Sequence, residues 1–168
     1  MKTSENAISA IKTFESLHDG DLHQIGLQPK MCPAGYWTEG YGSLILNEQG
    51  RTIRGIENKL LAYKYAKIHT QQEADKALRK DIAQREEMIN SLNLTQLTQG
   101  QFDALVDFCY NVGFANLKSS TLLKRIKYNR EDTKAIRNAF MMWVKSGKRT
   151  LPGLVNRRTQ EANWFEEK

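Results

Sequence analysis

The sequence has few cysteines and few prolines, and it has no long apolar run. It contains two cysteines, Cys32 and Cys109, and three prolines in 168 residues. Two cysteines fit neither a disulfide framework nor a metal cluster, so we expect reduced thiols and no metal site. No stretch approaches the roughly 20 apolar residues of a membrane-spanning helix, so we expect no stable membrane insertion. Residues 1–17 also lack the apolar core of a signal peptide, which predicts synthesis in the cytoplasm.

The charge and composition place the chain among folded, basic proteins. There are 25 basic and 19 acidic residues, which give a net charge of +6, and 40% of the residues are hydrophobic. The charge suits a polyanionic partner. The sequence has no run of five like charges and no nucleic-acid-binding motif, so we expect no nucleic-acid partner. The apolar content is sufficient for the core of one domain, and a monomer is the default expectation.

Helical periodicity of apolar residues is found along most of the chain. Ser4 is suited to cap the first such segment, and Glu15 falls in its last turn. Thr98 is suited to cap a later segment, which Gly113 closes. The predicted helices cover residues 4–17, 70–92, 99–112, 119–128, 131–146 and 153–166.

A β-hairpin is predicted between the first two of these helices. Residues 36–46 alternate in polarity and are rich in aromatic, Ile and Leu side chains, as in a strand. Residues 47–50 would turn the chain, and residues 51–53 would form the returning strand. Gly40 and Gly42 bracket an aromatic residue inside the first of these strands.

The expected fold is therefore α+β, in one domain with two lobes. Residues 1–69 would form an N-terminal lobe with a helix and a hairpin, and residues 18–36 within it are irregular. Residues 70–92 would form a connecting helix roughly 30 Å long. Residues 93–168 would form a helical lobe. A cleft between two lobes is a common place for a ligand site.

Three side chains are expected to converge on this cleft: Glu15, Cys32 and Thr38. Glu15 lies at the negative end of a helix dipole and beside Phe14, which disfavours its ionised form and suits a general acid. The Thr38 hydroxyl both donates and accepts, so it can hold a water molecule. Cys32 could assist as a partial thiolate, although only a few per cent of an ordinary thiol ionises at pH 7. A proton donor and a held water are what the hydrolysis of a glycosidic bond requires.

Other carboxylates compete for the role of the base that activates water. Glu39 follows Thr38 directly, so in a strand it points to the opposite face. Asp19 and Asp21 lie in the irregular loop and could also reach the cleft. Structural roles remain open as well, because Cys is often a small buried hydrophobe and Thr is an ordinary strand residue.

At these residues the sequence resembles the phage-type lysozymes, the endolysins of glycoside hydrolase family 24. Members show a Glu, eight residues, an Asp or Cys, five residues and a Thr, followed by a Gly-aromatic-Gly strand. The matching segments are Glu15, Cys32–Thr38 in its Cys form, Gly40–Gly42, Gln101–Leu105, Asn111–Gly113, Ser119–Leu123, and Leu151–Leu154 with Arg157, Arg158 and Glu161.

The sequence departs from the family pattern in two places. Sixteen residues, not eight, separate Glu15 from Cys32, so the loop at residues 18–31 carries an insertion. Insertions are tolerated in such loops, and we expect Glu15 still to face Thr38. Ser43 stands where the family commonly has a His with a structural role, so a stabilising polar contact would be lost while activity need not be.

The resemblance implies a lysozyme-like fold and an enzyme that needs no cofactor. It would cleave the β-1,4 bond between N-acetylmuramic acid and N-acetylglucosamine in the peptidoglycan glycan strand, and so break down the bacterial cell wall. Glu15 would be the general acid, Thr38 would position water and Cys32 would replace the family's second polar group. Without a signal peptide, the enzyme would reach the wall after release by another factor. A wall-binding module without activity is the alternative.

The resemblance also assigns residues in the helical lobe. Asn111 would line the sugar subsites, and Ser120 or Thr121 would hydrogen-bond the glycan. One of Arg157 and Arg158 could pair with Glu15, although an ordinary surface arginine is equally compatible with the sequence.

Overall fold

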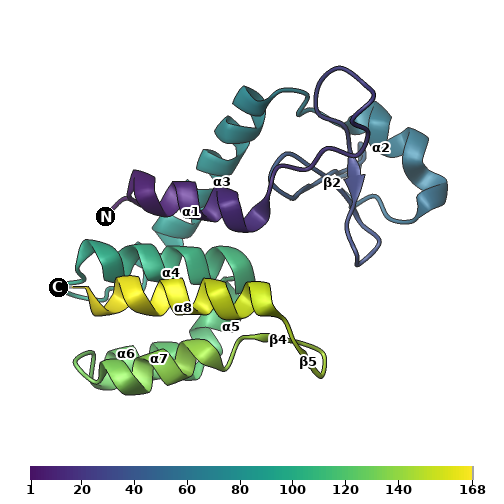
Figure 1. Cartoon of the computed structure of the whole chain (residues 1–168). Coiled ribbons are helices and arrows are strands. Elements are labelled where there is room, and N and C mark those ends of the chain that lie inside the picture. The colour runs from purple at the N-terminus through teal and green to yellow at the C-terminus, as the bar shows by residue number, and fades with distance from the viewer. Residues whose placement is uncertain (168) are drawn as a thin grey trace. The chain divides into compact units, whose positions relative to one another are not determined.

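The computed structural model describes residues 1–167 and divides into two compact units. The hairpin unit comprises Glu15–Asp81, and the helical unit comprises Met1–Phe14 together with the chain from Ile82 onward. The long helix α3, Gln71–Asn90, continues across the boundary between the two units (Figure 1). The sequence placed residues 1–69 in one lobe, whereas here the first 14 residues belong with the C-terminal helices.

Hydrogen bonds from its first turn tie helix α1, Glu5–Glu15, into the helical unit. Ser4 caps the helix as predicted, because its Oγ accepts a bond of 3.2 Å from the Ala7 N–H. Ser4 also donates to Asp103 of helix α4, Gln99–Val112, with its N–H at 3.0 Å and its Oγ at 2.6 Å. These charge-assisted bonds explain why residues 1–14 join a unit whose other residues lie far along the chain.

Helix α4 begins and ends at the predicted residues. Thr98 and Gln101 form a reciprocal capping box, with Thr98 Oγ1 accepting from the Gln101 N–H and Gln101 Oε1 accepting from the Thr98 N–H. At the other end Gly113, with φ of 86°, donates its N–H to the Cys109 carbonyl. The side chains of Phe102–Cys109 are all buried, so α4 is the central helix of its unit.

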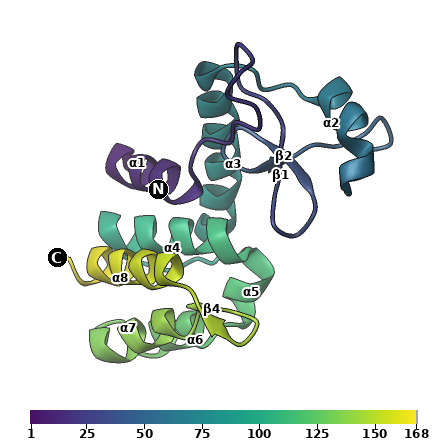
Figure 2. The ribbon, with the colours of Figure 1, turned by 45° about the vertical axis from the view of Figure 1, so that its right-hand side comes forward.

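The helical unit packs its remaining helices around α4. Helix α8, Pro152–Glu166, runs beside α4 in both ribbon views (Figures 1 and 2). The other helices are α5 (Phe114–Ser119), α6 (Thr121–Tyr128) and α7 (Thr133–Met141). The core contains edge-to-face aromatic contacts that join Phe108 to Phe140 at 5.6 Å and Phe140 to Phe165 at 6.1 Å between ring centroids.

The predicted helix over residues 131–146 is wrong at its C-terminal end. Helix α7 stops at Met141, and a short hairpin of strands β4 (Lys145–Ser146) and β5 (Arg149–Thr150) follows. Gly147 lies in the turn with φ of 59°, a conformation that suits glycine and breaks a helix. The apolar residues Trp143 and Val144 continue the helical pattern of the sequence beyond Met141, where the helix ends.

The hairpin unit is built on a three-stranded antiparallel sheet with the order β1-β2-β3. The strands are β1 (Lys30–Met31), β2 (Trp37–Glu39) and β3 (Ser43–Leu44). A 3-10 turn at Ile56–Asn58 and helix α2, Lys59–Tyr65, follow the sheet. The core of this unit is a cluster of Trp37, Ile45, Ile53 and Ala62.

The prediction of one strand over residues 36–46 is wrong, because the chain reverses at Gly40–Gly42. Glu39 pairs with Ser43, and the two glycines adopt φ of 58° and 95°. These left-handed conformations are the reason for glycine at both positions. Strand β1 lies in a segment that the sequence analysis described as irregular, and its two residues are too few to show a periodicity.

We expect Gly40→Ala to destabilise the hairpin unit more than Gly50→Ala does. Both glycines have a positive φ, so an alanine costs about 1–2 kcal/mol at either position. A Cβ on Gly40 would also lie 3.0 Å from Ile68 Cδ1, whereas a Cβ on Gly50 meets nothing within 4 Å. Crowding should add about 1–3 kcal/mol at Gly40 alone. Urea unfolding of the two variants measures the difference, and equal stabilities would contradict the tight packing of the Gly40 turn.

Candidate active site

The structure places Glu15, Cys32 and Thr38 in the hairpin unit. Glu15 is the last residue of α1 and is half-buried, and Ser16 after it takes φ of 59°, which ends the helix. Cys32 follows β1, and Thr38 is the middle residue of β2. The catalytic roles assigned to these three residues remain predictions.

Cys32 begins the tight turn that joins β1 to β2. Its carbonyl accepts a bond of 2.8 Å from the Gly35 N–H, and its own N–H donates to the Tyr36 carbonyl at 2.8 Å. Gly35 has φ of 82°, a left-handed conformation that glycine adopts readily in such a turn. The Cys32 side chain is half-buried.

A pocket of about 500 Å³ opens on this turn. Its lining residues are His18, Lys30, Met31, Cys32, Pro33 and Gly35. A cationic side chain, an imidazole and a thiol therefore border one cavity, which is large enough for part of a sugar chain.

Thr38 is 3% exposed, and its hydroxyl has two polar neighbours. Its Oγ1 donates to the Lys30 carbonyl across the β1–β2 pair at 2.8 Å, and it also lies 2.8 Å from Nδ1 of His18. The His18 N–H donates to the Gly40 carbonyl at 2.7 Å, which fixes the backbone beside the ring. A threonine held from both sides has one defined hydroxyl position.

His18 is the residue that the sequence reasoning missed. It is one of three histidines and stands three residues after Glu15, a signal that could have singled it out. Burial lowers the pKa of His18, the Lys30 ammonium lowers it further, and the Glu15 carboxylate opposes both. His18 is therefore neutral at pH 7.

Glu39, the alternative candidate for the base that activates water, binds backbone groups of another segment. Its side chain is 7% exposed, and its Oε2 accepts bonds from the Lys67 N–H at 2.6 Å and the Ile68 N–H at 2.9 Å. Thr38 and Glu39 thus have different partners, as expected for neighbours on a strand. Glu39 stabilises the segment that leads into α3.

The loop carboxylates Asp19 and Asp21 bind their own loop. Asp19 Oδ1 accepts from the backbone N–H groups of Asp21 and Gln28, at 3.2 and 3.3 Å. Asp21 accepts from the His23 N–H at 3.0 Å and from Gln24 Nε2 at 2.8 Å. The bond from Gln24, followed by that from His23, lowers the pKa of Asp21. Both carboxylates therefore order the inserted loop, and a role for either as the base that activates water remains a prediction.

Ser43, which replaces the family's histidine, makes only a long contact. Its Oγ lies 3.5 Å from Oδ2 of Asp81 on α3. This distance exceeds the usual 2.5–3.0 Å of an O–H···O hydrogen bond, so the contact adds little stability.

The three sugar-binding residues predicted in the helical unit differ in their accessibility. Asn111 and Thr121 are exposed, and Asn111 Oδ1 accepts a bond of 3.1 Å from Arg158 Nη2. Ser120 is buried, and its Oγ donates to the Leu117 carbonyl and accepts from the Leu123 N–H as the cap of α6. The Ser120 hydroxyl is therefore committed to the helix, which leaves Thr121 as the candidate from this pair.

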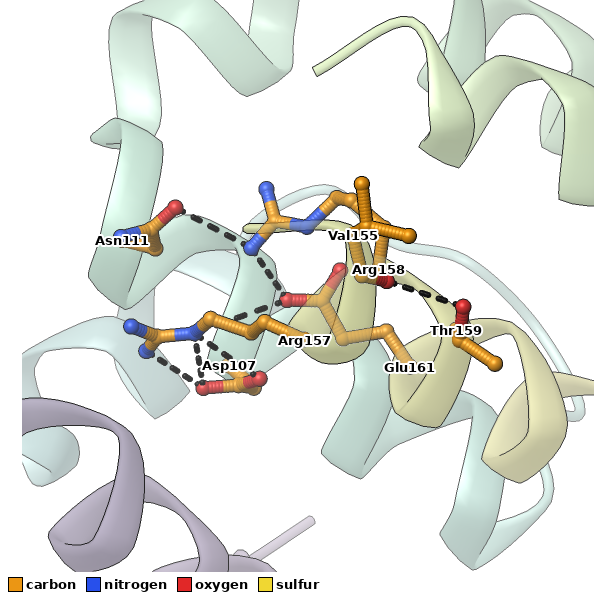
Figure 3. A network of polar contacts seen from close by, with 7 residues as sticks. All are labelled: Asp107, Asn111, Val155, Arg157, Arg158, Thr159 and Glu161. Carbon is orange, nitrogen blue, oxygen red and sulfur yellow. Dashed lines mark hydrogen bonds and ion pairs between the residues drawn. The ribbon is translucent and has the colours of Figure 1, made fainter. Parts of the chain in front are cut away.

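A buried ionic network joins α8 to α4 (Figure 3). Arg157 Nη2 lies 2.6 Å from Asp107 Oδ1, and Arg158 Nη2 lies 2.6 Å from Glu161 Oε1. The Arg158 guanidinium also stacks over Phe108, 4.7 Å from the ring centroid. Two cations and two carboxylates are thus buried together, which balances the charge in the core.

The environment of this network acts strongly on its charged groups. Burial raises the pKa of Glu161, the Asp107 carboxylate raises it further, and Arg158 opposes both. Burial also lowers the pKa of Arg158. Both arginines have acidic partners within the helical unit, and the pairing of one of them with Glu15 remains a prediction.

Comparisons with known proteins agree on one family. The family model described as "Phage lysozyme" matches residues 22–161. The endolysin of Acyrthosiphon pisum secondary endosymbiont phage 1 is 35% identical over 99% of both chains. The endolysin of Bacillus phage B103 is 33% identical over 98% of this chain, which spans 54% of that relative's length.

Solved structures show the same fold. The muramidase domain of SpmX from Asticaccaulis excentricus matches with a TM-score of 0.69 and 28% identity over 99% of both chains. Phage endolysin and lysozyme structures also match over nearly the whole chain. The expected lysozyme-like α+β fold is therefore confirmed. Among the described residues, no helix is both long and apolar enough to cross a bilayer.

We expect Glu161→Ala to destabilise the helical unit by about 3–5 kcal/mol, because it leaves the buried Arg158 without its carboxylate. The double variant Arg158→Met/Glu161→Leu removes both charges and should recover most of this loss. Urea unfolding measures both, with the exposed Glu167→Ala as the control. If Glu161→Ala is as stable as the parent, the buried Arg158 does not depend on the Glu161 carboxylate.

We expect Glu39→Ala to destabilise the hairpin unit by about 2–3 kcal/mol, since it leaves the Lys67 and Ile68 N–H groups without an acceptor. Glu39→Gln retains a carbonyl oxygen and should cost about half as much. Thermal unfolding is the measurement, and Glu57→Ala changes an exposed glutamate for comparison. A Glu39→Gln protein that is fully stable but unable to clear bacterial walls would instead point to chemistry at Glu39.

Proposed function

This chain belongs to the phage lysozyme family, and from that premise we propose that it is a lysozyme that degrades bacterial peptidoglycan. The bond cleaved is the β-1,4 linkage between N-acetylmuramic acid and N-acetylglucosamine. The names of its relatives, endolysin and muramidase domain, support wall breakdown as the activity. The observation that carries the proposal is that His18 and Cys32 line one pocket, that His18 contacts Thr38, and that Glu15 belongs to the same unit.

Glu15 supplies the proton. Hydrolysis needs an acid that protonates the leaving oxygen of the glycosidic bond, and Glu15 offers a half-buried carboxyl at the end of α1. Once the bond has broken, Glu15 is left as a carboxylate, and the proton that the attacking water releases passes through solvent to restore the Glu15 carboxyl.

Thr38 holds the water that attacks the sugar. Its hydroxyl is fixed by the Lys30 carbonyl and by His18, so a water bound to it has a defined position. Cys32 lines the adjoining pocket and assists through its polar sulfur. Asn111 and Thr121 contribute to glycan binding through their exposed side chains.

The substrate also explains the basic surface. A net charge of +6 favours docking to the anionic polymers of a bacterial wall. The protein acts as a monomer on the glycan strand, without a cofactor, after another factor has released it to the wall.

We expect Glu15→Gln to lower wall clearing by at least about 100-fold, because the amide cannot donate the proton of a general acid. The measurements are the turbidity of a suspension of stripped bacterial walls and the appearance of new reducing ends. Glu57→Gln makes the same chemical change at an exposed position and should leave both unchanged. Circular dichroism checks that both variants are folded.

Two outcomes would contradict the proposal in different ways. Full activity of Glu15→Gln would remove Glu15 from the role of acid. A parent protein that pellets with walls but releases no sugar fragments would be a wall-binding module, not an enzyme.

A further inference from the structure

The Thr38 hydroxyl has one proton and two neighbours that could receive it. Its Oγ1 lies 2.8 Å from the Lys30 carbonyl oxygen and 2.8 Å from His18 Nδ1. A carbonyl oxygen can only accept, so the bond to Lys30 uses the threonine proton. The contact with His18 is then a hydrogen bond only if the imidazole donates. This count requires a hydrogen on Nδ1.

We propose that His18 is a positioning residue of this enzyme: its Nδ1–H donates to Thr38 and makes that hydroxyl a pure acceptor for the attacking water. The inference rests on the proposed hydrolysis and adds to it the direction of each hydrogen bond. Thr38 Oγ1 has two lone pairs, and His18 occupies one of them. The remaining lone pair accepts one O–H of the water, so the water oxygen keeps its own lone pairs for the sugar.

The backbone around His18 is arranged to hold the ring in this orientation. The His18 N–H is bound to the Gly40 carbonyl at 2.7 Å. A Cβ built on Gly42 would lie 3.7 Å from Cε1 of His18, so the ring packs in contact distance of the glycine turn. The imidazole also lines the pocket beside Cys32. Main chain and ring are therefore both fixed where Nδ1 meets Thr38.

The charged groups around His18 affect its protonation, and therefore the hydrogen bond from its Nδ1–H to Thr38, as the pH changes. Lys30 on β1 and Glu15 on α1 act on the ring with opposite sign, and Cys32 borders the same pocket. Burial lowers the pKa of His18, so the ring is neutral at pH 7. The protonated ring also carries a hydrogen on Nδ1 and keeps the bond to Thr38. The neutral ring keeps it only as the Nδ1–H tautomer, in which Nε2 has no hydrogen.

Three substitutions of His18 distinguish the role of Nδ1 from that of Nε2. The amide of His18→Asn places an N–H donor near the position of Nδ1, His18→Gln places one near Nε2, and His18→Ala has no donor. We expect kcat for wall fragments to fall about 10- to 100-fold in the Ala and Gln variants, with KM unchanged, and to stay within about threefold of the parent in the Asn variant. His23→Ala and His69→Ala change exposed histidines and serve as controls.

The opposite pattern would overturn the proposal. If the Gln variant is active and the Asn variant is as impaired as the Ala variant, Nε2 is the working nitrogen. If the Ala variant keeps the parent kcat, His18 does not position Thr38. Urea unfolding of each variant shows whether a loss of rate is a loss of fold, and rescue by Asn alone distinguishes positioning from stability.

A second measurement does not depend on activity. Nitrogen NMR of the histidine-labelled full chain, at a pH where the ring is neutral, reports which ring nitrogen carries the hydrogen. We expect His18 as the Nδ1–H tautomer, and the Nε2–H tautomer would overturn the proposal. If the tautomer is as expected but the parent releases no sugar fragments, the hydrogen bond stands and the proposed hydrolysis fails, together with the positioning role.

Discussion

The reversal of the chain at Gly40–Gly42 is the constraint on which the hairpin unit depends. Two left-handed glycines on either side of Tyr41 turn β2 back into β3 within three residues. The Gly40 carbonyl holds the backbone of His18, and the strand before the turn presents Thr38 to the imidazole. The same strand directs Glu39 to the segment before α3. The alternation of side chains along strand β2 thus gives its neighbours Thr38 and Glu39 different partners: Thr38 contacts His18, and Glu39 binds the segment before α3.

The helical unit depends instead on buried pairs of arginine and carboxylate side chains. Arg158 is fully buried, and burying such an ion alone would cost several kcal/mol. Glu161 and the ring of Phe108 offset this cost by direct contact, and Arg157 pairs with Asp107 beside them. The Arg157–Asp107 pair and the hydrogen bond from Arg158 to Asn111 fix the register of α8 on α4, because a shift of one residue would break both contacts.

Local signals predicted helices and caps well, because a cap is decided by residues three positions apart. Ser4, Thr98 and Gly113 were placed correctly for this reason. Tertiary pairing was not predictable in the same way. Strand β1 has only two residues and is defined by its pairing with β2 across the Cys32–Gly35 turn. His18 could not be predicted from local sequence, because its role depends on a contact with Thr38, which lies 20 positions further along the chain.

The division of the chain has a consequence for its synthesis on the ribosome. The Ser4 N–H bonds to Asp103 across 99 residues, so the first helix emerges long before its partner has been translated. The hairpin unit is contiguous, and its partners have all been made once Asp81 has left the exit tunnel. Translation therefore allows the segment with the pocket to fold first, while α1 waits for α4 to complete the other unit.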